Sequence, residues 1–283
     1  KQLQMIESPM GPRISIRGRG EVDCFCSNNY LGLANHPDVV EAGIQGLRKY
    51  GAGTSSVRFI CGTFAPHEAL EERIASFLGV EASYTFVSCW NATEATFPTL
   101  CQDGDVIVSD ELNHACIIDS MRLTTAIHRG VSKCIYTHSD MESLRNALMT
   151  AMQKRSDEGA IFVITDGVFS MEGDIALLPE IRSLCDEFGA VLVVDDSHGT
   201  GVMGETGRGT HEHYGMAGSD IDIFTGTLGK ALGGGAGGYV AGKREAVELL
   251  VQRGRPTLFS NALPVTVACS AKAAIDTLDN NPS

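Results

Sequence analysis

The chain is short of positive charge and has no long apolar run. Its 283 residues contain 22 Lys and Arg against 35 Asp and Glu, which gives a formal net charge of −13. A surface that binds nucleic acid needs clustered basic side chains to neutralise phosphates, so this balance argues against a nucleic-acid partner. No apolar run reaches the ~18 residues that a membrane-spanning helix requires, and Lys1 does not open a signal-peptide pattern. We therefore expect neither nucleic acid nor membrane as a partner.

Cysteine pairs of the Cys-x-x-Cys kind are missing as well. The nine cysteines, an odd number, are scattered along the chain, so neither a disulfide framework nor a zinc site is indicated. A reducing compartment follows, which we take to be the cytoplasm or, behind a removed targeting peptide, the mitochondrial matrix. Cys24 and Cys26 alternate with Phe25 as residues of a strand do, and we expect them to pack in the core.

From about Asp38 onward, helix-period and strand-like segments alternate, which predicts a layered α/β domain with a mostly parallel sheet. His67–Leu78 reads as a helix with one apolar face, which Gly79 can end. Six short apolar runs are typical of strands covered on both faces. They are Tyr84–Val87, Asp105–Val108, Cys134–Tyr136, Ile161–Ile164, Val191–Val194 and Ile221–Phe224.

The chain divides into three parts. Residues 1–37 read as an N-terminal arm, and residues 38–262 as one large domain. Residues 263–283 read as the start of a helix, Leu263–Leu278, that leads toward a further domain outside this sequence.

Polar residues follow several of the predicted strands. In open α/β sheets ligands collect beyond the carboxyl ends of the strands, so we expect these clusters to face one crevice. They are Ser88–Trp90, Ser109–Asp110, Thr165–Asp166, Asp195–His198 and Thr225–Thr227.

Lys230 stands out because it lies in a loop of small residues directly after an apolar run. An amine that condenses with a carbonyl needs small neighbours that admit a flat cofactor, and surroundings that lower its pKa. Lys230 is therefore a candidate Schiff-base nucleophile. Thr227 and the backbone amides around Gly229 are suited to holding a phosphate.

Seven segments, in order over nearly the whole chain, resemble the α-oxoamine synthase family of fold-type I pyridoxal-phosphate enzymes. The resemblance implies a large domain with a mostly parallel sheet flanked by helices, an N-terminal arm, and a small C-terminal domain largely outside this chain. The string Val57–Thr63 favours the glycine C-acetyltransferase branch. The segments are Ser27–Leu33, Ser56–Thr63, Ser109–Ala115, Thr165–Met171, Val194–His198, Gly226–Gly234 and Arg255–Asn261.

The resemblance assigns the catalytic roles to four residues. Lys230 matches the lysine that binds the cofactor aldehyde and removes the substrate Cα proton. Asp195 matches the carboxylate that pairs with the pyridine nitrogen. His198 matches the histidine that hydrogen-bonds the phenolic oxygen, and His114 the imidazole stacked on the ring.

Other matched positions imply further contacts with pyridoxal 5'-phosphate. The backbone amides of Cys89 and Trp90, with the Thr227 hydroxyl, are expected to hold the phosphate at a helix N-terminus. Ser170 matches a position close to the cofactor.

Three more matches concern the substrate and a second subunit. Ser260 and Asn261 match residues that reach the phosphate of the neighbouring subunit, which implies a homodimer with shared active sites. Asn28 matches an arm residue that approaches the substrate carboxylate. The family's carboxylate-binding arginine is expected beyond Ser283.

The implied reaction is acetyl transfer from acetyl-CoA to glycine, giving 2-amino-3-oxobutanoate and CoA. The same residues serve relatives that lose the carboxylate and form 5-aminolevulinate or 8-amino-7-oxononanoate, so that alternative stays open. A non-catalytic partner subunit of the same fold and an aldol cleavage of threonine-like substrates are further alternatives. Trp90 and Glu94 depart from the family pattern and leave the acyl preference open.

Two Gly-x-Gly-x-x-Gly strings, Gly199–Gly204 and Gly233–Gly238, raise the possibility of a dinucleotide cofactor. The first runs into a turn-rich segment and the second follows no predicted strand, so we interpret both as glycine-rich loops. Five histidines outside the matched motifs are interpreted as structural: His36, His128, His138, His211 and His213.

Overall fold

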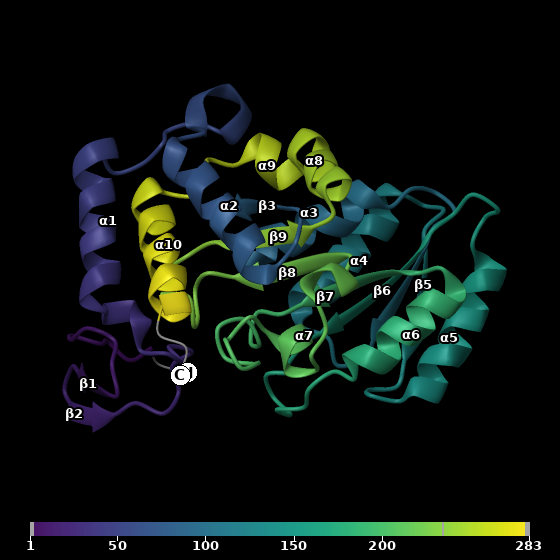
Figure 1. Cartoon of the computed structure of the whole chain (residues 1–283), viewed down its shortest axis with the longest axis horizontal. Coiled ribbons are helices and arrows are strands. Elements are labelled where there is room, and N and C mark those ends of the chain that lie inside the picture. Colours follow the sequence, from purple (N-terminus) through teal and green to yellow (C-terminus); the bar gives the residue numbers. More distant parts are fainter. Residues whose placement is uncertain (1–2, 234, 281–283) are drawn as a thin grey trace.

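The computed structural model of the chain describes residues 3–233 and 235–280, with a seven-stranded sheet through the middle of the molecule (Figure 1). The strand order is β3-β9-β8-β7-β6-β4-β5. Five neighbouring strands, from β8 to β5, run parallel, and β9 is antiparallel to both β3 and β8. The predicted mostly parallel α/β fold is confirmed. The strands are β3 (Ala82–Phe86), β4 (Val106–Asp110), β5 (Ser132–Tyr136), β6 (Ile161–Asp166), β7 (Val191–Asp195), β8 (Ile223–Thr227) and β9 (Gly238–Gly242).

The helices cover both faces of this sheet. They are α1 (Pro37–Tyr50), α2 (Ala65–Leu78), α3 (Cys89–Leu100), α4 (Ala115–Ile127), α5 (Met141–Lys154), α6 (Leu178–Phe188), α7 (Thr210–His213), α8 (Arg244–Arg253), α9 (Arg255–Phe259) and α10 (Val265–Asn280). Short 3-10 turns lie at Leu33–Asn35 and Gly218–Asp220, and a π turn at Arg58–Gly62.

One apolar core lies on each face of the sheet, because successive strand side chains point to opposite faces. Val106 and Val108 of β4 pack into the core shared by α2, α5, α6 and α10. Ile107, between them, packs into the core shared by α3, α4 and α8. Both faces of β4, β6, β7 and β8 are therefore buried, as their apolar runs predicted. For the run Cys134–Tyr136 the prediction is wrong, because β5 lies at the edge of the sheet and exposes Lys133 and Ile135 on one face.

Helices α1 and α10 lie side by side at one end of the molecule (Figure 1). Gly43 and Gly46 of α1 allow this approach, because a Cβ on Gly46 would lie 2.8 Å from the Cys269 sulfur. The Ser270 hydroxyl donates to the Val39 carbonyl at 3.0 Å across the same contact. The helix predicted at Leu263–Leu278 is thus present as α10, and it packs against the first helix of the large domain.

The arm contains a small hairpin of β1 (Arg13–Ile16) and β2 (Gly20–Asp23). The expectation that Cys24 and Cys26 pack in a core is wrong. The hairpin ends at Asp23, Cys24 is half-buried, Cys26 is exposed, and 95% of Phe25 is accessible to solvent.

The sequence reasoning missed β9, but it placed the end of α2 and the start of β8 closely. A Cβ on Gly238 would lie 2.3 Å from the Cys89 nitrogen, so glycine is required where β9 passes the first turn of α3. Gly79 ends α2 in the left-handed conformation (φ 71°), as predicted. Strand β8 begins at Ile223 rather than Ile221.

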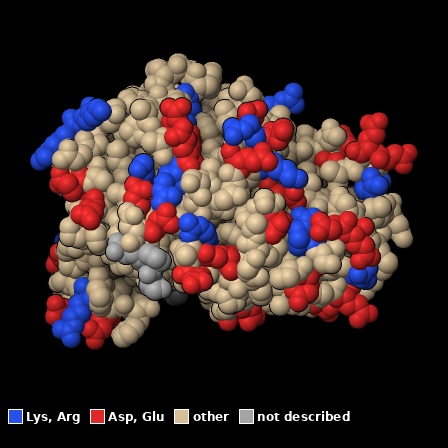
Figure 2. Space-filling model, viewed as in Figure 1, with Lys and Arg blue, Asp and Glu red and all other residues tan. Residues whose placement is uncertain are grey.

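Acidic and basic side chains are interspersed on the face drawn in Figure 2. In residues 3–233 and 235–280, no helix combines the length and the apolar character needed to cross a membrane.

Candidate active site at the carboxyl ends of the strands

Three neighbouring strands bring polar residues together at one edge of the sheet. The register pairs Asp166 at the end of β6 with Asp195 at the end of β7, and Asp195 with Thr225 of β8. Asp195 is 4% and Asp166 is 7% exposed. The crevice predicted from the strand ends therefore contains two buried carboxylates on adjacent strands.

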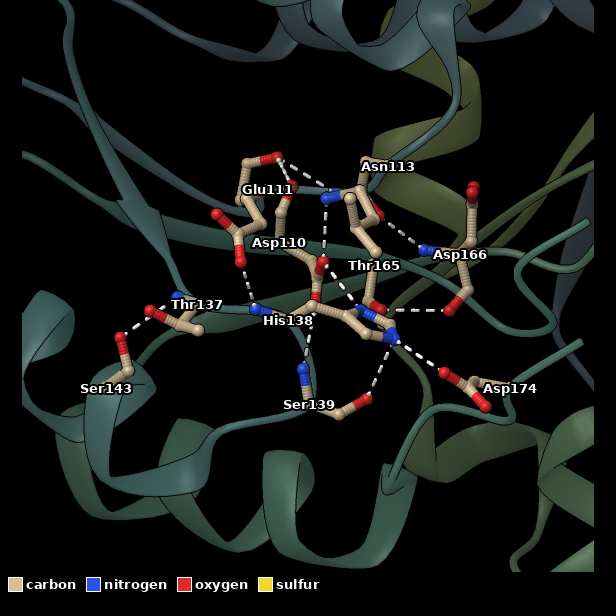
Figure 3. A network of polar contacts seen from close by, with 12 residues as sticks. Asp110, Glu111, Asn113, Thr137, His138, Ser139, Ser143, Thr165, Asp166 and Asp174 are labelled. Atoms are coloured by element: carbon tan, nitrogen blue, oxygen red, sulfur yellow. Dashed lines mark hydrogen bonds and ion pairs between the residues drawn. The ribbon is translucent and has the colours of Figure 1, made fainter. Parts of the chain in front are cut away.

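These two carboxylates repel each other at short range. Burial and the negative charge of Asp195 raise the pKa of Asp166, although Lys230 opposes the shift. Asp166 accepts a hydrogen bond from the His114 backbone nitrogen at 3.0 Å, and its own nitrogen donates to the Asn113 side chain at 2.8 Å (Figure 3). Asp166 is thus held in place by two hydrogen bonds, beside a second buried carboxylate.

Lys230 lies in the loop after β8, and its amine is 2.7 Å from Nε2 of His198. Burial lowers the pKa of Lys230, and the nearby carboxylates only partly compensate. Burial and the Lys230 charge lower the pKa of His198 to about 4, so this imidazole is neutral near pH 7. The predicted amine and histidine are therefore in direct contact.

Tyr30, which the sequence reasoning gave no role, completes this contact from the arm. Its hydroxyl lies 2.8 Å from Nδ1 of His198 and donates to the Asn28 side-chain oxygen at 3.1 Å. Asn28, predicted to approach the substrate, is therefore joined to Lys230 through Tyr30 and His198. The matched segment Ser27–Leu33 contains Tyr30, but nothing in its sequence predicts the contact with His198.

The N-terminus of α3 faces the same crevice. Ser88 caps the helix by accepting from the Asn91 nitrogen at 3.1 Å, which leaves the first-turn amides of Cys89 and Trp90 without helical partners. The Thr227 hydroxyl accepts from the Gly229 nitrogen at 3.1 Å, in the loop that leads to Lys230. Binding of a phosphate by Cys89, Trp90 and Thr227 stays a prediction.

Two thiols converge on Asp195 from the starts of α3 and α4. The sulfurs of Cys89 and Cys116 lie 3.7 and 3.9 Å from Oδ2 of Asp195. Burial and the Asp195 charge raise the pKa of Cys89 well above its usual range and that of Cys116 to about 12. Both thiols therefore keep their protons and act as weak donors to this carboxylate. Cys116 was missed by the sequence reasoning.

His114 caps α4 by accepting from the Cys116 nitrogen at 3.2 Å. The Trp90 ring meets its imidazole edge to face, with centroids 6.5 Å apart. Because 43% of Trp90 is exposed, this ring pair is open to solvent.

The hydrogen bonds and ring contacts described for this group do not extend to three of the predicted residues, Ser170, Ser260 and Asn261. Ser170 is exposed on a hairpin closed by a bridge between Val168 and Ile175. Asn261 is exposed just after α9, and the neighbouring Ser260 lines a cavity of 880 Å³ between α3, α4, α8 and α9. The lining of that cavity does not include Lys230. The proposed contribution of Ser260 and Asn261 to a partner's site stays a prediction.

The residues present fit a pyridoxal phosphate. The amine of Lys230 suits the aldehyde, the buried pair of Asp166 and Asp195 suits a protonated ring nitrogen, and the amides of α3 suit the phosphate. The close approach of Gly238 to Cys89 packs the backbone of β9 against the first turn of α3, whose amides we call the phosphate cradle.

Comparisons with known proteins agree with this fit. Residues 23–281 match the family of class I and II aminotransferases. The chain is 48% identical over 281 residues to an 8-amino-7-oxononanoate synthase from Thermoanaerobacter pseudethanolicus, covering 99% of this chain and 68% of the relative. It is 46% identical over 273 residues to the 2-amino-3-ketobutyrate coenzyme A ligase of Escherichia coli, covering 96% and 67%. The chain thus spans about two thirds of these relatives.

Among solved structures, a serine palmitoyltransferase from S. paucimobilis with bound PLP and myriocin superimposes with a TM-score of 0.89 at 30% identity. That match covers 98% of this chain and 67% of the solved one.

Fold and site together define a fold-type I pyridoxal-phosphate transferase. The chain belongs to the class I and II aminotransferase family and, within it, to the α-oxoamine synthases, which are PLP-dependent acyltransferases. Its cofactor is pyridoxal phosphate.

Proposed function

We propose that the protein transfers the acetyl group of acetyl-CoA to glycine, giving 2-amino-3-oxobutanoate and CoA. The observation that carries the chemistry is the 2.7 Å contact between the Lys230 amine and His198, beside the buried Asp195. The string Val57–Thr63 and the relatives named 2-amino-3-ketobutyrate coenzyme A ligase support the choice of substrates.

Each residue of the site has a defined task in this proposal. The cofactor, when bound, withdraws electrons from the amino-acid Cα and so makes its proton acidic. Lys230 holds the cofactor aldehyde and then takes the Cα proton on Nζ, for which its lowered pKa is suited. The glycine Cα bonds to the acetyl carbon, the carbon–sulfur bond breaks, and CoA leaves as the thiolate.

The remaining residues bind and orient. Asp195 pairs with the ring nitrogen, and its two thiol neighbours hold the carboxylate in position. His198 contacts the phenolic oxygen, and His114 stacks on the ring. Cys89, Trp90 and Thr227 bind the phosphate, Ser170 borders the cofactor, and Asn28 approaches the substrate carboxylate.

We also propose a homodimer in which Ser260 and Asn261 reach the partner's phosphate. The free cysteines are typical of a protein in a reducing compartment, and we propose the cytoplasm. The mitochondrial matrix is the alternative, because the relatives from Bos taurus and Homo sapiens are named mitochondrial.

The cofactor lysine is tested by the visible absorption of the purified holoprotein. A band that borohydride removes is expected, and Lys230→Ala should lack it. Lys133→Ala, which changes an exposed lysine on β5, is the matched control and should keep the band. A Lys230→Ala protein with an unchanged, reducible band would show that another amine holds the cofactor.

The fate of the carboxylate is tested with glycine labelled at C1. In the presence of acetyl-CoA, free CoA should appear without an equal amount of labelled CO₂. Quenching at early times in borohydride reduces the ketone, so the label should be recovered in threonine stereoisomers. Labelled CO₂ released in step with CoA would show that the decarboxylating reaction is the right one.

The decarboxylating reaction is a second candidate because relatives at 48% and 46% identity are named 8-amino-7-oxononanoate synthases. The carbon skeleton of that product corresponds to alanine without its carboxylate, joined to a pimeloyl chain. Turnover of alanine with pimeloyl-CoA faster than glycine with acetyl-CoA would favour this candidate.

A further inference from the structure

His138, interpreted from sequence as a structural histidine, lies between two carboxylates beyond the ends of the strands. It follows β5, and its Nδ1 is 3.0 Å from Oδ1 of Asp110 while its Nε2 is 3.1 Å from Oδ2 of Asp174 (Figure 3). An ionised carboxylate only accepts hydrogen bonds, so both ring nitrogens must donate. The geometry is that of an imidazolium shared by two aspartates.

The first aspartate belongs to the turn that carries His114. Asp110 ends β4, is 3% exposed, and also accepts from the Leu112 nitrogen at 2.9 Å. Its second oxygen accepts from the Ser139 nitrogen at 3.2 Å, next to His138. The position of the turn after β4, and hence of the first residue before α4, depends on this carboxylate.

The second aspartate belongs to the hairpin that carries Ser170. The Phe169 nitrogen donates to the Asp174 carbonyl at 2.9 Å, and Val168 bridges Ile175. The buried Phe169 ring lies edge to face against the His138 imidazole, with centroids 4.4 Å apart. His138 therefore contacts this hairpin through a charge and through an aromatic ring.

We propose that His138 is a positioning residue whose positive charge ties the His114 turn to the Ser170 hairpin and thereby sets the affinity for pyridoxal phosphate. This inference rests on the proposed roles of His114 and Ser170 at the cofactor. His138 itself does not touch the reacting atoms.

The charge of His138 depends on pH in a defined direction. Asp110 faces it from β4 and Asp174 from the hairpin, while Ser139 lies beside it and Glu111 accepts from its backbone nitrogen at 2.9 Å. Burial opposes protonation, but the hydrogen bonds to the two aspartates outweigh it and raise the pKa of His138. The interaction of charged His138 with the two aspartates is complete below its unfolded pKa of about 6.5. It is lost as the pH rises through the higher pKa of His138 in the folded protein.

Cofactor binding to the apoprotein is the first readout. Trp90 is the single tryptophan of the sequence and lies at the proposed phosphate site, so its fluorescence should report titration with pyridoxal phosphate. We compare the dissociation constants of wild type and His138→Gln at several pH values. We divide the dissociation constant of the variant by that of wild type at each pH. Any pH dependence that Lys230 and the cofactor contribute equally to both proteins cancels in this ratio.

The expected ratio is about tenfold near pH 6, where a charge-assisted pair is lost, and it should approach unity as His138 deprotonates. Asp174→Asn removes one of the two carboxylates, so its ratio to wild type should also exceed one near pH 6 and approach unity over the same pH range, in which wild-type His138 loses its proton. His213→Gln, at an exposed histidine, is the matched control and should match wild type throughout. A ratio that is constant with pH, or that equals one at every pH, would overturn the proposal.

The charge itself is measured by histidine nitrogen spectra of the uniformly ¹⁵N-labelled apoprotein, assigned with His138→Gln. Both nitrogens of His138 should be protonated near pH 6. A neutral tautomer at that pH would overturn the proposal even if the variants fold poorly. Neither readout requires turnover. A negative result for His138 is therefore distinct from failure of the proposed reaction, which is tested by the Lys230→Ala spectrum and by labelled glycine.

Discussion

At the scale of single residues, the hydrogen bonds of Tyr30 determine which nitrogen of His198 carries the proton. The Tyr30 hydroxyl donates to Asn28, so it accepts from Nδ1 of His198, and Nε2 remains an acceptor for Lys230. A neutral imidazole with one defined tautomer is the arrangement expected for a residue that orients a proton on Lys230.

Tyr30→Phe removes that acceptor and should leave His198 with mixed tautomers. We expect a fivefold to tenfold loss in kcat/KM, at about 1 kcal/mol for one hydrogen bond, with unchanged thermal stability. The assay is CoA release with a thiol reagent. Tyr214→Phe, remote in sequence and contacting His213, is the control, and equal losses in both variants would contradict the role of Tyr30.

Asp166 provides a prediction for the apoprotein. Its raised pKa means that its contribution to stability is full below the unfolded value of about 3.9 and is lost as the pH rises through the folded value. Asp166→Asn keeps an acceptor for the His114 nitrogen and should stabilise the apoprotein by about 1–2 kcal/mol at pH 8, with little effect at pH 4.

Thermal melts at the two pH values measure this difference. Asp119→Asn, which alters an exposed pair with Arg122, should show no such pH-dependent gain. If Asp166→Asn is less stable than wild type at pH 8, repulsion between Asp166 and Asp195 does not destabilise the apoprotein.

Residue-scale prediction from sequence reached the groups whose chemistry is visible in a motif. The structure places Lys230 against His198 and buries Asp195 beside them, as the matched segments led us to expect. Tyr30 and Cys116 were missed because their significance lies in contacts between segments far apart in the chain. No spacing rule encodes the contact of Tyr30 with a histidine 168 residues away.

At the scale of elements, the position of the phosphate cradle at the start of α3 depends on how closely β9 packs against it. A Cβ on Gly238 would lie 2.3 Å from the Cys89 nitrogen and 2.4 Å from its Cα, and backbone atoms cannot rotate away. Gly238→Ala should therefore separate β9 from α3, with a loss of about 1–3 kcal/mol in stability and at least a tenfold weaker affinity for pyridoxal phosphate.

Gly235→Ala, three residues earlier in the loop that leads into β9, is the matched control. Its Cβ would make an ordinary contact at 3.5 Å with Val267, so both stability and affinity should stay near wild type. Urea unfolding of the apoprotein and cofactor titration give the two numbers. Normal cofactor affinity in Gly238→Ala would show that the close approach is not part of the cradle.

Elements with a clear period were predictable, and those with atypical composition were not. The apolar runs that became β4, β6 and β7 signal burial on both faces. Strand β9 escaped detection because glycines at Gly237 and Gly238 read as loop, although packing against α3 demands them. The arm hairpin has no buried face to impose a period, since most of its side chains are exposed or half-buried.

At the scale of the whole molecule, the chain leaves large apolar side chains in solvent. Phe25 is 95%, Met171 is 87% and Phe259 is 74% exposed. Phe259 directly precedes Ser260 and lines the cavity beyond α3, away from Lys230. Exposed apolar groups of this size are typical of surfaces that another molecule covers. A single sequence shows which residues are apolar, but their exposure depends on the assembled fold.

The proposed homodimer with shared sites predicts that two inactive variants restore each other. Lys230→Ala removes the amine, and the double variant Ser260→Asp with Asn261→Asp places negative charge where the partner's phosphate is expected. In a heterodimer of the two, one site contains both changes and the other contains neither. A heterodimer purified through two different tags should therefore regain about half of the wild-type activity per dimer, because a two-fold axis gives one intact site of two. If all these residues served the site of their own chain, every site in the heterodimer would carry a lesion and no activity would return. Size-exclusion chromatography with light scattering confirms that the tested species is a dimer, so an inactive dimer contradicts shared sites, whereas a monomer contradicts the assembly itself.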